Sequence, residues 1–312
     1  MTSYAFVEPL LTLPLGTQVV TRVEIMGPNG MDTRPRNAVG VVVAAPDAHN
    51  VCYRVRFADG FEALLCREDL TIRKHAPSDG VARAIGVPED VDLYAFVIYR
   101  CVIGSRAYGL DEAGSDTDRR GIYLPPAALH WSLAGVPEQL ENGERQECYW
   151  ELQKFLRMAL KANPNVLECL YTPLVEMATP LAEELLSMRS LFLSRFIYQT
   201  YNGYVMSQFK HLEQDLRANG VTKWKHAMHL IRLLLSGVTV LREGFVPLRM
   251  DEHRDRLLAI RRGEMAWEEI NEWRLRLHAM FDTALASTHL PEHPAYAEVN
   301  AFLVRARQSM AL

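Results

Sequence analysis

The sequence predicts an α+β protein in which a β-rich region is followed by a mixed region and then by helices. Short runs rich in β-branched and aromatic residues, separated by turn signals, fill residues 1–75. Two further apolar runs follow at 93–103 and 121–124, and helical signals dominate from residue 149 onward. Because 49% of the 312 residues are hydrophobic, the chain can bury a sizeable core and form more than one domain.

The N-terminal region is expected to form several short strands. They are predicted at 19–20, 39–45, 53–57 and 61–65, with turns at 27–30, 46–47 and 58–60. Apolar and basic residues alternate through the third run, and Asp59-Gly60 after it is a strong hairpin signal. So many short strands in 75 residues predict a small SH3-like β-barrel, which either binds nucleic acid or a partner or serves as a structural dock. Residues 75–89, with their Pro and Gly, read as a linker.

Composition excludes several classes of protein. The net charge of −4 indicates no bulk attraction to nucleic acid, so any such contact must be a local patch. The five cysteines form no C-x-x-C pair, which argues against a zinc ribbon or a disulfide framework and favours a reduced, cytoplasmic compartment. We expect neither a signal peptide nor a membrane span. The sequence does not indicate an oligomeric state.

The chemistry is expected in the segment that follows the first apolar run. Gly104-Ser105 lets a backbone turn approach a bound anion, and the Ser hydroxyl and backbone N–H groups can hold phosphate oxygens. Asp116 and Asp118 come next, and on a strand residues i and i+2 point to one face. Two adjacent carboxylates repel each other, and a hard cation is the usual counter-charge. We therefore expect a Mg²⁺ site, with two ions and with Mn²⁺ as a substitute, that orients a triphosphate for in-line attack.

The sequence of this segment resembles that of a known protein family. Residues 104–109 read Gly-Ser-Arg-Ala-Tyr-Gly, and 115–123 contain Ser-Asp-Thr-Asp and Arg-Gly-Ile-Tyr. Together with 152–156, 163–168 and 225–233, they resemble nucleotidyltransferases of the DNA polymerase β superfamily, in particular the predicted members associated with RNA repair and RNA ligases. The resemblance covers residues 95–245. It implies a short mixed sheet flanked by helices, and transfer of a nucleoside monophosphate from an NTP to an acceptor hydroxyl with release of pyrophosphate.

The resemblance also implies roles for single residues. By this resemblance, Asp116 and Asp118 are expected to be the catalytic metal ligands. The nucleotide-binding residues are expected to be Gly104, Ser105 and Arg106. At the positions of Thr117 and Arg119 the superfamily commonly has apolar residues, which suggests that this segment is an exposed edge strand.

A third carboxylate is less clearly marked. Superfamily enzymes usually place it on a neighbouring strand, where it acts on the attacking hydroxyl. Glu144, Glu147 and Glu151 precede the helix expected at 152, and Glu147 is preferred because the Cys-Tyr-Trp after it reads as a strand. The alternative is an ordinary surface glutamate at the start of a strand.

The helical half carries a polar stripe. Lys225, His229 and Arg232 share one helix face with Ser236, and they are expected to face triphosphate oxygens across a cleft. The alternative is a solvated helix face. Glu168 is expected to pair with a basic residue.

We therefore expect three domains: a small β-barrel at 1–75, a catalytic domain at 90–185 and a helical domain at 186–312 that completes the nucleotide cleft. Three functions remain open. The acceptor is an RNA end, or it is a protein, as in antitoxin-like nucleotidyltransferases, or the chain is a non-catalytic nucleotide- or RNA-binding module. The intact aspartate pair argues against the last, and the barrel and the basic face around Lys154 favour RNA.

Overall fold

The computed structural model describes residues 13, 15–26, 33–36, 38–46, 52–72, 91–143, 145–219 and 224–311. The chain divides into two compact units, Met1–Glu89 with Ser132–Pro137 and Asp90–Trp131 with Glu138–Leu312. The boundary expected at 185/186 falls inside the second unit. The turn expected at 27–30 and the linker expected at 75–89 lie outside the described residues.

The first unit contains an antiparallel sheet of five strands in the order β6-β5-β4-β1-β7. The strands of this sheet are β1 (Gln18–Thr21), β4 (Val39–Ala44), β5 (Tyr53–Phe57), β6 (Glu62–Leu65) and β7 (Leu70–Ile72). A short helix, η1 (Arg67–Asp69), precedes β7, and β2 (Ile25–Met26) pairs separately with β3 (Thr33–Arg34).

The hairpin of β5 and β6 is confirmed. Tyr53, Val55 and Phe57 are buried while the arginines between them are exposed, so the alternation of the sequence matches the two faces of the strand. The turn contains Asp59, whose carboxylate accepts from the next residue but one, and Gly60 at φ +88°. Glycine adopts that conformation without a steric penalty, which is why the dipeptide forms a tight hairpin.

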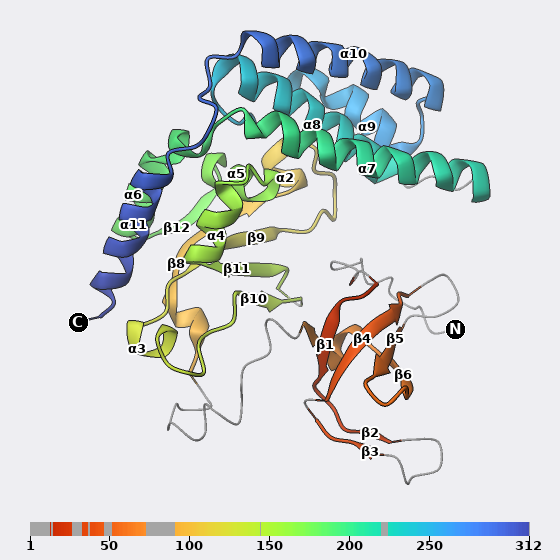
Figure 1. Ribbon diagram of the computed structural model, residues 1–312. Helices are drawn as coiled ribbons and strands as arrows, with labels where there is room; N and C mark the ends of the chain where they lie inside the picture. Colours follow the sequence, from red (N-terminus) through yellow and green to blue (C-terminus); the bar gives the residue numbers. More distant parts are fainter. Residues whose placement is uncertain are drawn as a thin grey trace. The chain divides into compact units, whose positions relative to one another are not determined.

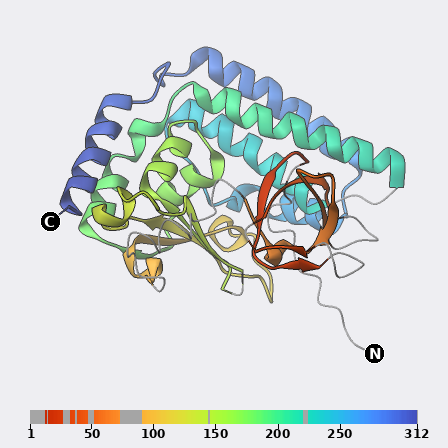
Figure 2. The same cartoon turned by 60° about the horizontal axis from the view of Figure 1, so that its bottom comes forward.

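The expected SH3-like barrel is not confirmed. The strands curl around an apolar core that includes Val19, Val42 and Val55 (Figure 2). However, β6 and β7 are the two edges of the sheet and do not pair with each other in the described part of the chain, so the sheet stays open.

The second unit is built on a mixed sheet in the order β10-β11-β9-β8-β12. Its strands are β8 (Val97–Ile103), β9 (Asp118–Tyr123), β10 (Gln139–Asn142), β11 (Glu147–Glu151) and β12 (Val175–Ala178). Only β9 and β11 run parallel; the other described pairs of this sheet are antiparallel. The core strand β8 has the sequence VIYRCVI, whose β-branched and aromatic residues favour a strand buried in the middle of a sheet.

Helices cover this sheet and extend beyond it. They are α2 (Ser105–Tyr108), α3 (Ala127–His130), α4 (Leu152–Ala159), α5 (Pro164–Tyr171), α6 (Pro180–Ser187), α7 (Phe196–Asn219), α8 (Trp224–Glu243), α9 (Arg254–Arg262), α10 (Trp267–Ser287) and α11 (Tyr296–Ser309), with short helices η3 (Leu93–Phe96), η4 (Arg189–Phe192) and η5 (Asp251–His253). Helices α4 and α5 lie on one face of the sheet, and α8 packs against α7, α9 and α10 (Figure 1). The described residues contain no helix that is long and apolar enough to cross a membrane.

The expected start of α5 is confirmed. The Asn163 side chain caps the helix by accepting from the backbone N–H of Asn165 at 3.1 Å and of Val166 at 3.4 Å, and Pro164 occupies the first turn. Proline loses nothing there, because the first N–H groups of a helix have no partner within it.

Candidate active site

The Gly-Ser turn and the Asp118 carboxylate meet at one point of the second unit. Strand β8 ends at Ile103, which pairs with Asp118, the first residue of β9. Gly104 follows with φ +77° and ψ −156°, a conformation open essentially to glycine alone. A Cβ atom at Gly104 would lie 2.4 Å from Oδ2 of Asp118. Only glycine therefore lets this turn lie directly against the carboxylate.

Asp116 is close along the chain but is not part of the strand. It is exposed and lies in the loop that leads into β9, so the two aspartates do not occupy one strand face as expected. The expectation of an edge strand is also wrong, because β9 lies between β8 and β11. The polar residues Thr117 and Arg119 are tolerated because they lie at the loop end of that strand, before its buried part begins at Gly121.

Charge compensation for the pair is incomplete. Nη2 of Arg120 lies 3.4 Å from Oδ1 of Asp118, which places one cation beside one carboxylate oxygen. Neither Oδ2 of Asp118 nor the carboxylate of Asp116 makes an ion pair or hydrogen bond with another described residue. Within the part of the chain that the structure describes, these oxygens therefore have no cationic partner.

Arg106 holds the backbone of the loop that carries Asp116. Its Nε donates to the Asp116 carbonyl at 3.2 Å, and its Nη2 donates to the Ser115 carbonyl at 2.9 Å. The guanidinium thus holds the backbone that carries Asp116, and the contact with nucleotide expected of Arg106 stays a prediction. Ser105 is half-buried at the start of α2, next to Gly104, and its expected contact with phosphate stays a prediction.

Glu147 does not join the pair. It is the first residue of β11 and is in register with Arg119 of β9. Residues in register share a face of the sheet, and alternate residues of a strand point to opposite faces. Glu147 therefore points to the face opposite Asp118, and the position beside Arg120 on the Asp118 face is Cys148. The sequence could not show this, because the face depends on the register. Glu144 lies outside the described residues.

The oxygen donors of Asp116 and Asp118 are of the kind that Mg²⁺ prefers. No group of three His, Cys, Asp or Glu residues that could hold a metal occurs in the described part of the chain. Mg²⁺ is usually bound through one or two carboxylates plus phosphate oxygens and water, so the carboxylates of the two aspartates are donors of the right kind. The lack of space for a Cβ at Gly104 shows how closely the turn approaches one of them.

Arg232 is buried and cannot face a solvent-filled cleft. Its side chain is 0% exposed, its Nη1 lies 2.7 Å from Oε1 of Glu168, and its guanidinium stacks 3.7 Å from the ring centroid of Tyr108. The Tyr108 hydroxyl donates to the other oxygen of Glu168 at 2.5 Å. The expectation that Glu168 pairs with a basic residue is confirmed, and the expected phosphate contact of Arg232 is corrected. This network ties α8 and α5 to α2, the helix that follows the Gly-Ser turn.

The rest of the polar stripe divides between surface and interior. Lys225 is exposed near the start of α8. His229 is half-buried, with Nδ1 3.3 Å from Nη2 of Arg232. Burial and the neighbouring arginine lower the pKa of His229 to about 3, so its imidazole is neutral near pH 7 and does not supply a positive charge. The four residues of the stripe thus lie on one helix face, but Arg232 and Ser236 are buried in the core.

Comparison with known proteins identifies the family of the chain. The family model described as RlaP, RNA repair pathway DNA polymerase beta family, matches residues 84–305. The uncharacterized protein YcgL of Bacillus subtilis (strain 168) is 26% identical over 155 residues, which are 48% of this chain and 58% of that protein. The match thus spans less than two thirds of that relative's length. No solved structure matches the chain at a significant level. From the match over residues 84–305, the chain belongs to the RNA repair pathway DNA polymerase β family.

Proposed function

We propose that the protein is a Mg²⁺-dependent nucleotidyltransferase that moves a nucleoside monophosphate from an NTP to the hydroxyl of an RNA end. The observation that carries this proposal is the contact between the Gly104 turn and the Asp118 carboxylate. An anion-binding turn and a metal-binding carboxylate at the same point suit a substrate that is both a polyanion and a metal ligand. The family match supports the class of reaction.

The chain's own residues would bind and orient the triphosphate. The backbone at Gly104 and the hydroxyl of Ser105 would hold phosphate oxygens, and Arg120 would offset part of the repulsion at Asp118. Asp116 and Asp118 would hold Mg²⁺, which when bound neutralises phosphate charge and supports in-line displacement. In the reaction the acceptor oxygen bonds to the α-phosphorus, the bond to the β-phosphate breaks, pyrophosphate leaves, and the hydroxyl proton passes to water.

The choice of RNA as acceptor rests on the family and on a basic surface at α4. The family's description places its members in RNA repair. The basic face expected on α4 is partly neutralised, because Lys154 pairs with Glu138 at 2.8 Å. Arg157 of α4 and Lys161, just after its end, belong to the same basic face, are exposed, and would contact a phosphate backbone.

The test is an acceptor survey with labelled nucleotides. The protein is incubated with each α-³²P-labelled NTP and Mg²⁺, in parallel with RNA that ends in a 3′-hydroxyl, RNA with a blocked 3′ end, and a protein extract without added RNA. We expect label on the RNA with the free 3′-hydroxyl only. The Asp118→Asn variant is the control for contaminating enzymes.

Two other outcomes discriminate the remaining functions. Label that appears on protein, and not on RNA, would replace the RNA acceptor by a protein acceptor while keeping the reaction class. No label on any acceptor, combined with measurable NTP binding, would contradict the enzymatic proposal and favour a binding module.

A further inference from the structure

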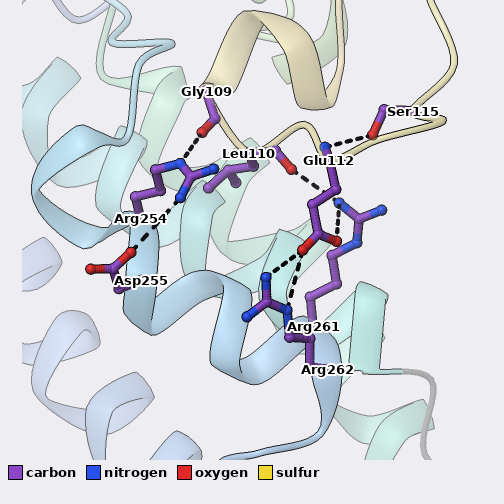
Figure 3. A network of polar contacts seen from close by, with 8 residues as sticks. All are labelled: Gly109, Leu110, Glu112, Ser115, Arg254, Asp255, Arg261 and Arg262. Atoms are coloured by element: carbon purple, nitrogen blue, oxygen red, sulfur yellow. Dashed lines mark hydrogen bonds and ion pairs between the residues drawn. The ribbon is translucent and has the colours of Figure 1, made fainter.

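The loop that leads to Asp116 is held from outside by helix α9. Nε of Arg254 donates to the Gly109 carbonyl at 2.9 Å, and Nη1 of Arg261 donates to the Leu110 carbonyl at 3.0 Å (Figure 3). Both carbonyls follow α2 directly. Two arginines from a helix about 150 residues further along the chain thus fix the start of this loop.

Glu112 binds the middle of the loop to α9 through ion pairs. Its Oε1 accepts from Nε of Arg262 at 3.2 Å and from Nη2 at 2.5 Å, and its Oε2 lies 3.9 Å from Nη1 of Arg261 (Figure 3). Its backbone is tied to Ser115, because the Glu112 N–H donates to the Ser115 hydroxyl at 2.9 Å and the Ser115 N–H donates to the Glu112 carbonyl at 3.0 Å. The Glu112 side chain therefore connects α9 to the residue just before Asp116.

These contacts bear on Asp116, because few other interactions with described residues fix its position. Asp116 is exposed, it lies outside any strand, and its carboxylate has no partner among the described residues. Its backbone is held on one side by Arg106 of α2, and through Ser115 and Glu112 it is held on the other by Arg262. Arg262 also holds the pKa of Glu112 below its usual value, so the carboxylate is charged near pH 7 and the ion pair is intact.

We propose that Glu112 is a positioning residue, which through its ion pair with Arg262 places the Asp116 carboxylate for cation binding. The inference rests on the proposed function and names a part of that site. An exposed ion pair contributes little to global stability. Its effect is local, because partners that orient metal ligands typically change metal affinity or activity by about 10- to 100-fold when they are removed.

The experiment measures Mn²⁺ binding by electron paramagnetic resonance, with ATP present, for Glu112→Gln, Arg262→Gln and the double variant. We expect each to weaken Mn²⁺ binding by about ten-fold or more. The double variant should bind Mn²⁺ as tightly as the single variants, because each single substitution already breaks the Glu112–Arg262 ion pair. The control is Arg276→Gln, which breaks the exposed Glu272–Arg276 pair on α10, at 2.7 Å, and should leave Mn²⁺ binding unchanged.

The outcomes separate this inference from the proposed function. Mn²⁺ binding by the wild type that is lost in Asp118→Asn but unchanged in Glu112→Gln would overturn the positioning role alone. The positioning role would also be overturned if Arg276→Gln lost as much Mn²⁺ affinity as Glu112→Gln, or if the losses of affinity added up in the double variant. A wild-type protein that binds no Mn²⁺ would overturn the proposed function, and the positioning role with it.

Discussion

The substitution Gly104→Ala tests the contact on which the candidate site depends. The new Cβ would lie 2.4 Å from Oδ2 of Asp118, whereas ordinary contacts begin at 3.4 Å, so the turn or the carboxylate must move by about 1 Å. A displacement of that size at a reacting centre can reduce the rate by about 100-fold. The backbone conformation adds a cost of about 1–3 kcal/mol in stability. We therefore expect a folded but less stable protein whose NTP-dependent transfer falls by about two orders of magnitude.

The control separates backbone strain from the clash. Gly244 follows α8 with φ +73°, and among the described residues a Cβ there would meet only Cδ2 of Leu290, at 3.9 Å. Gly244→Ala should cost about 1–2 kcal/mol of stability, because its backbone is left-handed, and should keep full activity. Activity is measured as the rate of label transfer, and stability by urea unfolding. A Gly104→Ala protein with wild-type transfer would refute the inferred closeness of the turn and Asp118.

Three further predictions concern other parts of the structure. Ser105→Ala should weaken NTP binding by about 0.5–1.5 kcal/mol in titration calorimetry, the value of one lost hydrogen bond, and unchanged affinity would contradict the phosphate-binding turn. Arg232→Met should cost about 3–5 kcal/mol in urea unfolding, because it leaves the buried Glu168 carboxyl without its ion-pair partner, and a variant as stable as wild type would contradict the network. Mild oxidation with diamide should join Cys52 and Cys66, whose sulfurs lie 3.0 Å apart, and peptide mapping that finds both still reduced would contradict the placement of the β5–β6 hairpin.

Local signals in the sequence predicted the parts of the fold that short segments determine. The β5–β6 hairpin follows from strict alternation and from Asp59-Gly60. The start of α5 follows from the asparagine cap and the proline after it. Gly104 could be recognised as a place of close approach, because glycine after a buried strand often marks such a turn. Each of these features is fixed by residues that are close in the sequence.

Features that depend on what packs against a segment could not be predicted. The common face of Lys225, His229 and Arg232 was visible in the sequence, but its burial depends on Glu168 of α5 and Tyr108 of α2. The short strands β10 and β12 were not expected, because Gln-Leu-Glu-Asn and Val-Glu-Met-Ala carry too few β-formers to show a period.

The contacts that the arginines of α9 make with Glu112 could not be predicted from the sequence either. They lie about 150 residues from Glu112 along the chain, and nothing in the sequence links the two segments. Such an ion pair becomes visible only when the fold brings both segments together.

The central claim is that the carboxylates of Asp116 and Asp118 support nucleotide transfer through a divalent cation. The most direct measurement is the Mg²⁺-dependent rate of α-³²P label transfer to RNA by wild type, Asp116→Asn, Asp118→Asn and the double variant, with folding checked by circular dichroism. These substitutions keep the size of the side chain and remove its charge. We predict that transfer by wild type requires Mg²⁺ and that every variant is folded and inactive. NTP-dependent transfer at the wild-type rate by the double variant would contradict the claim.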